Sequence, residues 1–278
     1  MKTTKELTAI ASQVRRDIIR MVTTAKSGHP GGSLSSTDIL TALYFSEMKH
    51  DPATWRRDAL GQDAFIPSAG HLAPVYYAVL ARAGYFDPAK MGTLRKFGTD
   101  LQGHPAVGHI KGVFQPSGSL GQGLAAAAGI ALGKKLQGQP ERAFVLLGDG
   151  ESEEGEIWET AMWAVHHKLD NLVAMTDWNG MQIDGPIETV TGIEELNEKW
   201  LAFGWDVIVA DGHDFESILN AFQLARKANG KPKMILFKTE MGHGVDFMAG
   251  SHKWHGKAPS AEQCAQALEQ LKETLGDY

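Results

Sequence analysis

The sequence predicts an α/β protein, a doubly wound and mostly parallel sheet with helices on both faces. Segments with strand-like and helix-like spacing alternate along its 278 residues, a rhythm that is typical of parallel sheets with crossover helices. The predicted strands are apolar throughout, as expected where helices cover both faces of a sheet. No linker or internal repeat divides the chain, so we expect one domain over residues 1–278 that includes a C-terminal loop and helix at 240–278.

Local patterns predict the individual elements. Leu7, Val14 and Ile18 share one face of a helix predicted at 5–24, because apolar residues recur there at helical spacing. The Gly- and Ser-rich segment SGHPGGSLSS is predicted as a loop. A run of small residues at 119–138 predicts a helix whose backbone another group approaches closely. The other predicted elements are a helix near 37–48, a short strand within 63–71, a helix ending near 83, an irregular stretch at 86–118, strands at 143–148, 171–177, 205–210 and 233–239, helices at 155–168, 193–203, 214–229 and 260–275, and a long loop at 240–259.

The composition excludes some classes of function. The formal charge is −6 and the pI is about 6.0, with Lys and Arg scattered along the chain, so we expect no nucleic-acid partner. No apolar run approaches the ~20 residues of a membrane span, and the N-terminus lacks a signal-peptide core. The single cysteine, Cys264, fits a cytoplasmic protein because disulfides are rare in that compartment.

An acidic residue follows one of the buried strands directly. In the segment FVLLGDGESEEGEIWE, Asp149 lies between Gly148 and Gly150 at the strand end, and Asn179 occupies the end of the next strand. Ligands bind beyond the carboxyl ends of parallel strands. The two side chains can therefore converge on a hard cation such as Mg²⁺, with a carbonyl just after Asn179 as a third ligand. The alternative is that Asp149 is a helix N-cap and Asn179 a turn residue.

The pattern GDG followed by Asn resembles the signature of thiamin diphosphate enzymes. The segments KSGHPGGSLS, SAGHLAPVYYAVL, QGHP, SGSLGQGL, LGDGESEEGEIWE, LDNLVAMTDWNGMQIDG, ADGH and WHGKAP occur in the order seen in transketolases. The match runs from residue 6 to about residue 260. The chain therefore resembles the N-terminal, diphosphate-binding part of a transketolase, and this implies the thiamin diphosphate-binding fold.

The resemblance implies thiamin diphosphate as cofactor and a Mg²⁺ ion, for which Ca²⁺ or Mn²⁺ can substitute. The side chains of Asp149 and Asn179 and the carbonyl of Met181 would hold the metal. Gly148 and Gly150 would let the diphosphate approach a helix N-terminus, which favours anions. The other implied cofactor contacts are Gly118 and Leu120 against the aminopyrimidine, Ile183 against the thiazolium, and Glu154 at the interface with a partner chain.

Four of the eleven histidines lie in Gly- or Pro-bounded loops, namely His29, His71, His104 and His255. Imidazoles titrate near neutral pH, so they can pass protons or bind sugar hydroxyls. The resemblance implies that His71 and His255 contact the diphosphate. It also implies that His29 and His255 transfer protons and that His104 binds a substrate hydroxyl.

Several other residues carry weaker signals. His213 has no recognisable chemical context, and His243 lies outside the matched motifs. Lys257 would add positive charge near the cofactor or substrate. Ala69 replaces a lysine that is usual in transketolases, which leaves the substrate range open. A solvated helix start, where negative charge favours the helix dipole, is expected for Glu151, Glu153 and Glu156.

The implied function is that of an N-terminal transketolase subunit, which moves a two-carbon ketol unit from a ketose phosphate to an aldose phosphate. In transketolases a glutamate of the next domain, on the opposite subunit, contacts the cofactor's pyrimidine. We therefore expect a C-terminal partner chain and a second copy of this chain in an α2β2 complex. Two alternatives stay open, a subunit of a 2-oxoacid dehydrogenase, which shares GDG and Asn, and a noncatalytic cofactor-binding assembly module. The SGHP and WHGKAP segments favour transketolase.

Overall fold

A five-stranded parallel sheet forms the centre of the computed structural model, which describes residues 2–193 and 195–278. The strands lie in the order β1-β2-β3-β7-β6, and each neighbouring pair is parallel. This confirms the predicted doubly wound fold. The single-domain organisation over 1–278 stays a prediction. The strand bounds are β1 (Ala64–Pro67), β2 (Ala143–Gly148), β3 (Leu172–Trp178), β6 (Asp206–Asp211) and β7 (Lys233–Lys238).

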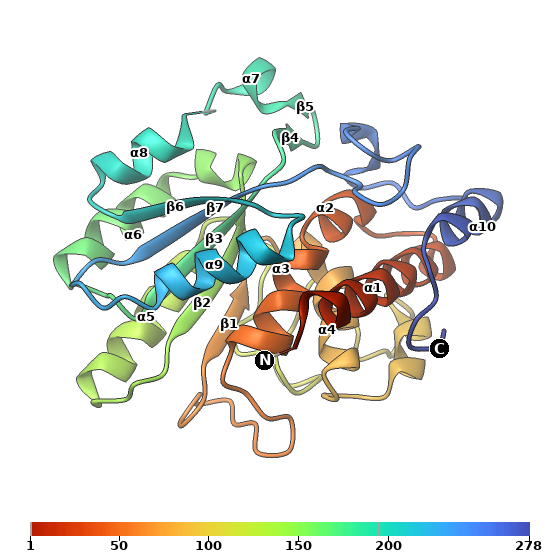
Figure 1. Ribbon diagram of the computed structural model, residues 1–278. Helices are drawn as coiled ribbons and strands as arrows, with labels where there is room; N and C mark the ends of the chain where they lie inside the picture. Colours follow the sequence, from red (N-terminus) through yellow and green to blue (C-terminus); the bar gives the residue numbers. More distant parts are fainter. Residues whose placement is uncertain (1, 194) are drawn as a thin grey trace.

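Helices cover both faces of this sheet (Figure 1). Along β2, Phe144 and Leu146 point into one hydrophobic core, and Val145 and Leu147 point into the other. A strand buried on both faces must be apolar at every position, which explains the continuous apolar runs. The edge strand β6 departs from that expectation, since Val209 is 46% exposed. The first core is packed by α1 (Thr4–Ala25), α3 (Thr37–Ala42), α4 (Ala73–Arg82) and α9 (Phe215–Ala225), and the second by α5 (Gln122–Leu136), α6 (Gly155–His166) and α8 (Leu196–Ala202).

The segment predicted as a loop, SGHPGGSLSS, contains a short buried helix, α2 (Pro30–Ser35). The loop was predicted from the three glycines and four serines of the segment, and that prediction is wrong because Pro30 takes the first helical turn, a position that favours proline. The predicted helix near 37–48 is divided into α3 and a π-helical turn at Leu43–Glu47. A hairpin of β4 (Met181–Gln182) and β5 (Gly185–Pro186) follows β3, and α7 (Ile187–Val190) comes next.

Smaller differences concern helix ends and loops. The helix expected at 193–203 is observed as α8, and Glu194 lies outside the described residues. The helix expected at 119–138 begins only at Gln122, after Gly121 with φ of +85°. The stretches 86–118 and 240–259 are irregular as expected, apart from short 3₁₀ turns at Pro88–Thr93 and His252–Trp254. Across the described parts of the chain, no helix combines the length and apolar character needed to cross a bilayer.

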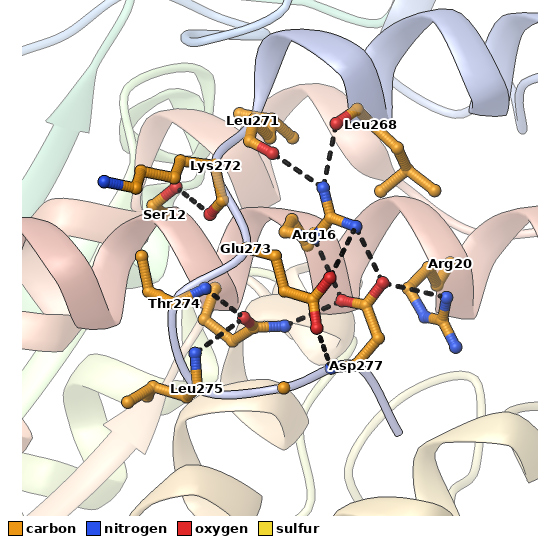
Figure 2. Close-up of polar contacts among 12 residues, drawn as sticks. Ser12, Arg16, Arg20, Leu268, Leu271, Lys272, Glu273, Thr274, Leu275 and Asp277 are labelled. Carbon is orange, nitrogen blue, oxygen red and sulfur yellow. Dashed lines mark hydrogen bonds and ion pairs between the residues drawn. The ribbon is translucent and has the colours of Figure 1, made fainter.

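The C-terminal helix α10 (Ala261–Gln270) is shorter than predicted, because Arg16 of α1 takes over its last carbonyls. Arg16 Nη1 donates to the carbonyls of Leu268 (2.8 Å) and Leu271 (2.6 Å). The chain then runs along α1, where Arg16 also pairs with Asp277 at 2.7 Å (Figure 2). Backbone groups that a longer helix would pair internally are thus satisfied by α1 side chains.

Candidate active site

Asp149 and Asn179 meet at the carboxyl ends of neighbouring strands. Gly148 of β2 pairs in register with Asp177 of β3, so the residues just beyond them leave the sheet side by side. Asp149 Oδ2 accepts a hydrogen bond from the Gly180 N–H (2.6 Å), and Oδ1 accepts one from Gly150 (2.8 Å). The predicted convergence of the two segments is therefore observed. Asp149 is an N-cap as well, of the 3₁₀ turn at Gly150–Glu153.

The Asp149 carboxyl group is almost completely buried, at 2% exposure. Burial raises its pKa to about 8, with repulsion from Asp177 as the second cause. None of the ion pairs found among the described residues involves Asp149. A buried acid without a positive partner is unfavourable in its charged form. A divalent cation beside Asp149 would therefore stabilise the charged carboxylate. The residues present thus fit a metal ion bound at this position.

Asp177 at the end of β3 orients Asn179, a role that was not predicted from the sequence. Its Oδ2 accepts from Ser35 Oγ (2.6 Å) and from Asn179 Nδ2 (2.9 Å), and its Oδ1 accepts from Thr239 Oγ1 (2.5 Å). Asn179 Oδ1 accepts from the Met181 N–H at 3.0 Å. These two bonds fix which way the Asn179 amide faces. The available signal was position, since Asp177 lies at the end of the buried strand that neighbours the one Asp149 follows.

A cavity of about 450 Å³ opens at these strand ends. Its walls come from the β2 and β3 ends, the β4–β5 hairpin and the loop before α5. Ile183 is 63% exposed at its rim. His29, His104 and Gly118 are not among the lining residues. The predicted site residues that line the cavity are His71, Leu120, Gly148, Asp149, Gly150, Glu154, Asn179, Met181, Ile183 and His255.

The four selected histidines form one cluster beside the cavity. The ring centroid of His29 lies 5.4 Å from that of His71, 5.7 Å from that of His255 and 6.5 Å from that of His104. Burial is the main cause that lowers the pKa of all four, with His29 reaching about 4 and His71 about 3. They are therefore neutral at neutral pH, and each ring can both donate and accept one hydrogen bond.

Glu151 corrects the expectation of a solvated helix start. It is 3% exposed, and burial raises its pKa. Its Oε1 accepts from the Gly121 N–H (2.9 Å) and from Ser68 Oγ, and its Oε2 accepts from the Gly148 N–H (3.0 Å). Glu151 thus ties the GDG turn to the start of α5. Nothing in the acid-rich sequence distinguishes the buried Glu151 from the more exposed glutamates that follow it.

His213 and His243, for which no role was expected, support the loop after β7. His213 Nδ1 lies 3.0 Å from Asp38 Oδ2, and His213 Nε2 accepts from the Glu240 N–H at 2.9 Å. The His243 ring stacks on His213 with centroids 3.5 Å apart. Arg15 donates twice to Asp38. Both His213 nitrogens and both Asp38 oxygens already have hydrogen-bond partners. These residues therefore support the loop and are not free to bind a metal ion.

The remaining predicted positions differ in exposure. Gly118 (φ +130°) packs against His104, where an added Cβ would lie 3.1 Å from the ring. Ala69 is fully buried in the first core, so the position of the usual lysine carries only a methyl group here. Lys257 is exposed, and its amine lies 5.5 Å from the Trp254 ring centroid.

The fold and the cavity define a class, an α/β domain that presents paired acid and amide side chains at parallel strand ends. The family model described as "Transketolase, thiamine diphosphate binding domain" matches residues 7–276. The chain belongs to this family, which confirms the predicted resemblance.

Relatives agree with this assignment. The chain is 40% identical to 6-deoxy-6-sulfo-D-fructose transketolase subunit SqwG of Clostridium sp. (strain MSTE9), over 94% of each chain. It is 38% identical to an apulose-4-phosphate transketolase subunit of Phocaeicola vulgatus, over 94% of this chain and 92% of the relative. A solved transketolase of Campylobacter jejuni superposes with a TM-score of 0.90 at 33% identity, over 98% of this chain and 43% of the other. The chain thus spans less than half of that longer enzyme.

Proposed function

We propose that this chain is the diphosphate-binding subunit of a two-chain transketolase. With a C-terminal partner it would transfer a two-carbon ketol unit from a ketose phosphate to an aldose phosphate. The observation that carries the proposal is that the Asp149–Asn179 pair and His255 line one cavity, with His29 directly behind it. A cofactor bound through a metal ion would then lie in the same cavity as the neutral histidines that carry protons.

The proposed cofactor is thiamin diphosphate with Mg²⁺, and Ca²⁺ or Mn²⁺ would be accepted. Asp149, Asn179 and the Met181 carbonyl would hold the ion, since Mg²⁺ prefers few protein oxygens and completes its shell with phosphate and water. Gly148 and Gly150 would let the diphosphate come close. When bound, thiamin diphosphate supplies the carbon nucleophile for ketol transfer.

The histidines would complete the site. His255 Nδ1 is buried without a hydrogen-bond partner among the described residues, so it is free to contact the diphosphate together with His71. His29 and His255 would move protons, and the more exposed His104 would bind a substrate hydroxyl. The remaining proposed contacts are the aminopyrimidine against Gly118 and Leu120 and the thiazolium against Ile183.

A partner chain would close the cavity from the side of Glu154 and Ile183, both of which are exposed. Two relatives of similar length are named as transketolase subunits, which supports a C-terminal partner. We propose an α2β2 complex located in the cytoplasm. The relatives' substrates, 6-deoxy-6-sulfo-D-fructose and apulose 4-phosphate, make anionic ketoses the first compounds to test.

Reconstitution tests the proposal. The chain is mixed with its C-terminal partner, thiamin diphosphate and Mg²⁺, and ketol transfer is measured on a panel of ketose phosphates and sulfonates. We expect turnover by the mixture and none by either chain alone. Full activity of this chain by itself would contradict the two-chain arrangement. Decarboxylation of pyruvate by the complex would favour the 2-oxoacid dehydrogenase alternative, and unchanged cofactor affinity in Asp149→Ala would favour the noncatalytic one.

A further inference from the structure

Arg95 lies behind the histidine cluster and has no role in the proposed site. Its Nη1 donates to Ser27 Oγ at 2.6 Å, and its Nη2 donates to the Gly103 carbonyl at 3.3 Å. The same Nη2 lies 3.5 Å from His29 Nδ1. One guanidinium group thus bridges the loop that carries His29 and the loop that precedes His104.

We propose that Arg95 is a positioning residue, which holds His29 in the tautomer with its proton on Nε2 and keeps the two histidine loops together. The importance of this tautomer for ketol transfer rests on the proposed function. The tautomer itself can be measured without any turnover.

The backbone at Arg95 is strained, and its surroundings maintain the strain. Its φ is +58°, a left-handed conformation that side chains other than Gly, Asn and Asp seldom adopt. The Arg95 N–H donates to the Leu101 carbonyl at 3.0 Å, and Leu94 and Leu101 are both buried. Strain of this kind persists where the neighbouring structure fixes it, and it is concentrated at functional sites.

The neighbouring glycines leave room for this arrangement. A Cβ at Gly103 would lie 3.1 Å from Arg95 Nε, so a larger residue there would displace the guanidinium. On the other side of His29, a Cβ at Gly256 would lie 3.5 Å from Nε2. The His29 ring is therefore enclosed between Arg95 at Nδ1 and the His255–Gly256 segment at Nε2.

The donor pattern selects the tautomer. A guanidinium group has only donors, so the nitrogen that faces it must accept, and the proton of a neutral ring then resides on Nε2. The charged or titratable groups that face His29 are Arg95, His71, His104 and His255. Burial and then the charges of His255 and Arg95 lower the pKa of His29, which keeps the ring neutral at pH 7.

The test compares the His29 tautomer in two variants by ¹⁵N NMR of the full chain at pH 7, with His29→Asn used to assign the signal. Arg95→Gly adopts the positive φ at no steric cost. Lys168→Gly is the matched control, because Lys168 is an exposed basic residue with φ of +52° far from the cluster in sequence. We expect the Nε2–H form to dominate about tenfold in the wild type, because a proton on Nδ1 would face the guanidinium donors, and a cost of ~1.4 kcal/mol gives that ratio.

In Arg95→Gly we expect this preference to fall severalfold and to return when ethylguanidinium is added, whereas Lys168→Gly should match the wild type. Arg95→Asn, which also tolerates the left-handed backbone, serves as a second variant should Arg95→Gly fold poorly. An unchanged tautomer ratio in a folded Arg95 variant would overturn the proposal. In the reconstituted complex, kcat should fall at least about tenfold with rescue by ethylguanidinium. If the complex shows no ketol transfer at all, the proposed function fails while the tautomer result stands.

Discussion

Asp149 and Asp177 are buried carboxyl groups at the ends of adjacent parallel strands, one register position apart. Repulsion from Asp177 is the second cause, after burial, of the raised pKa of Asp149. Hydrogen bonds from Ser35, Thr239 and Asn179 stabilise the Asp177 carboxylate, whereas Asp149 receives only backbone N–H groups. The two aspartates therefore have different roles: Asp177 orients Asn179, and Asp149 faces the cavity.

Replacing Asp177 tests whether it orients Asn179. In Asp177→Asn the new amide can no longer accept from all three donors, so Asn179 loses its fixed orientation. We expect Mg²⁺-dependent binding of thiamin diphosphate to weaken 10- to 100-fold, the usual range for residues that orient metal ligands. Isothermal titration calorimetry of the chain measures this, and Asp170→Asn, at the other end of the sheet, is the control. Equal affinity in both variants would contradict the orienting role.

The next prediction concerns Glu151, which joins the GDG turn to α5. Glu151→Gln keeps one oxygen but points a new donor at N–H groups of Gly121 or Gly148. Leaving buried donors unpaired costs about 1–3 kcal/mol, so the free energy of unfolding should fall by that amount. Urea unfolding measures the loss. Glu156→Gln, a half-buried position on α6, should change stability by less than about 0.5 kcal/mol.

These two carboxylates show what the sequence could and could not predict. The pairing of Asp149 with Asn179 was predictable because both residues follow from one local rule, that ligands gather beyond the carboxyl ends of parallel strands. The contacts of Asp177 and Glu151 were not, since Ser35 and Ser68 lie 142 and 83 positions away from them. Hydrogen bonds between residues so far apart in the sequence produce no periodic pattern from which they could be predicted. The four histidines of the cluster were selected because each lies in a Gly- or Pro-bounded loop, whereas their individual roles were implied only by the family resemblance, since irregular loops have no periodicity from which to place a side chain.

The ion pair between Arg16 and Asp277 of the C-terminal segment should make the stability of the fold depend on pH. The hydrogen bond from Arg16 is the main cause that lowers the pKa of Asp277 to about 2, below the ordinary value of 3.8 that applies in the unfolded chain. The stabilisation is therefore present above pH 3.8 and is lost as the pH falls toward 2. We expect Asp277→Asn to lose about 1 kcal/mol at pH 6, with solvent screening taken into account. The difference from wild type should shrink as the pH approaches 2, which denaturant unfolding at several pH values measures.

The last prediction concerns His213, whose hydrogen bonds support the loop after β7. His213→Ala leaves the Glu240 N–H without its acceptor and removes the ring on which His243 stacks. The loop after β7, which carries the cavity residue Met241, should then open more often. We expect a stability loss of about 0.5–1.5 kcal/mol, as for an ordinary hydrogen bond at an exposed position, and faster amide exchange over 239–250, measured by hydrogen–deuterium exchange. His109→Ala, at an exposed position, should leave exchange in this loop unchanged, and equal exchange in both variants would remove His213 from this supporting role.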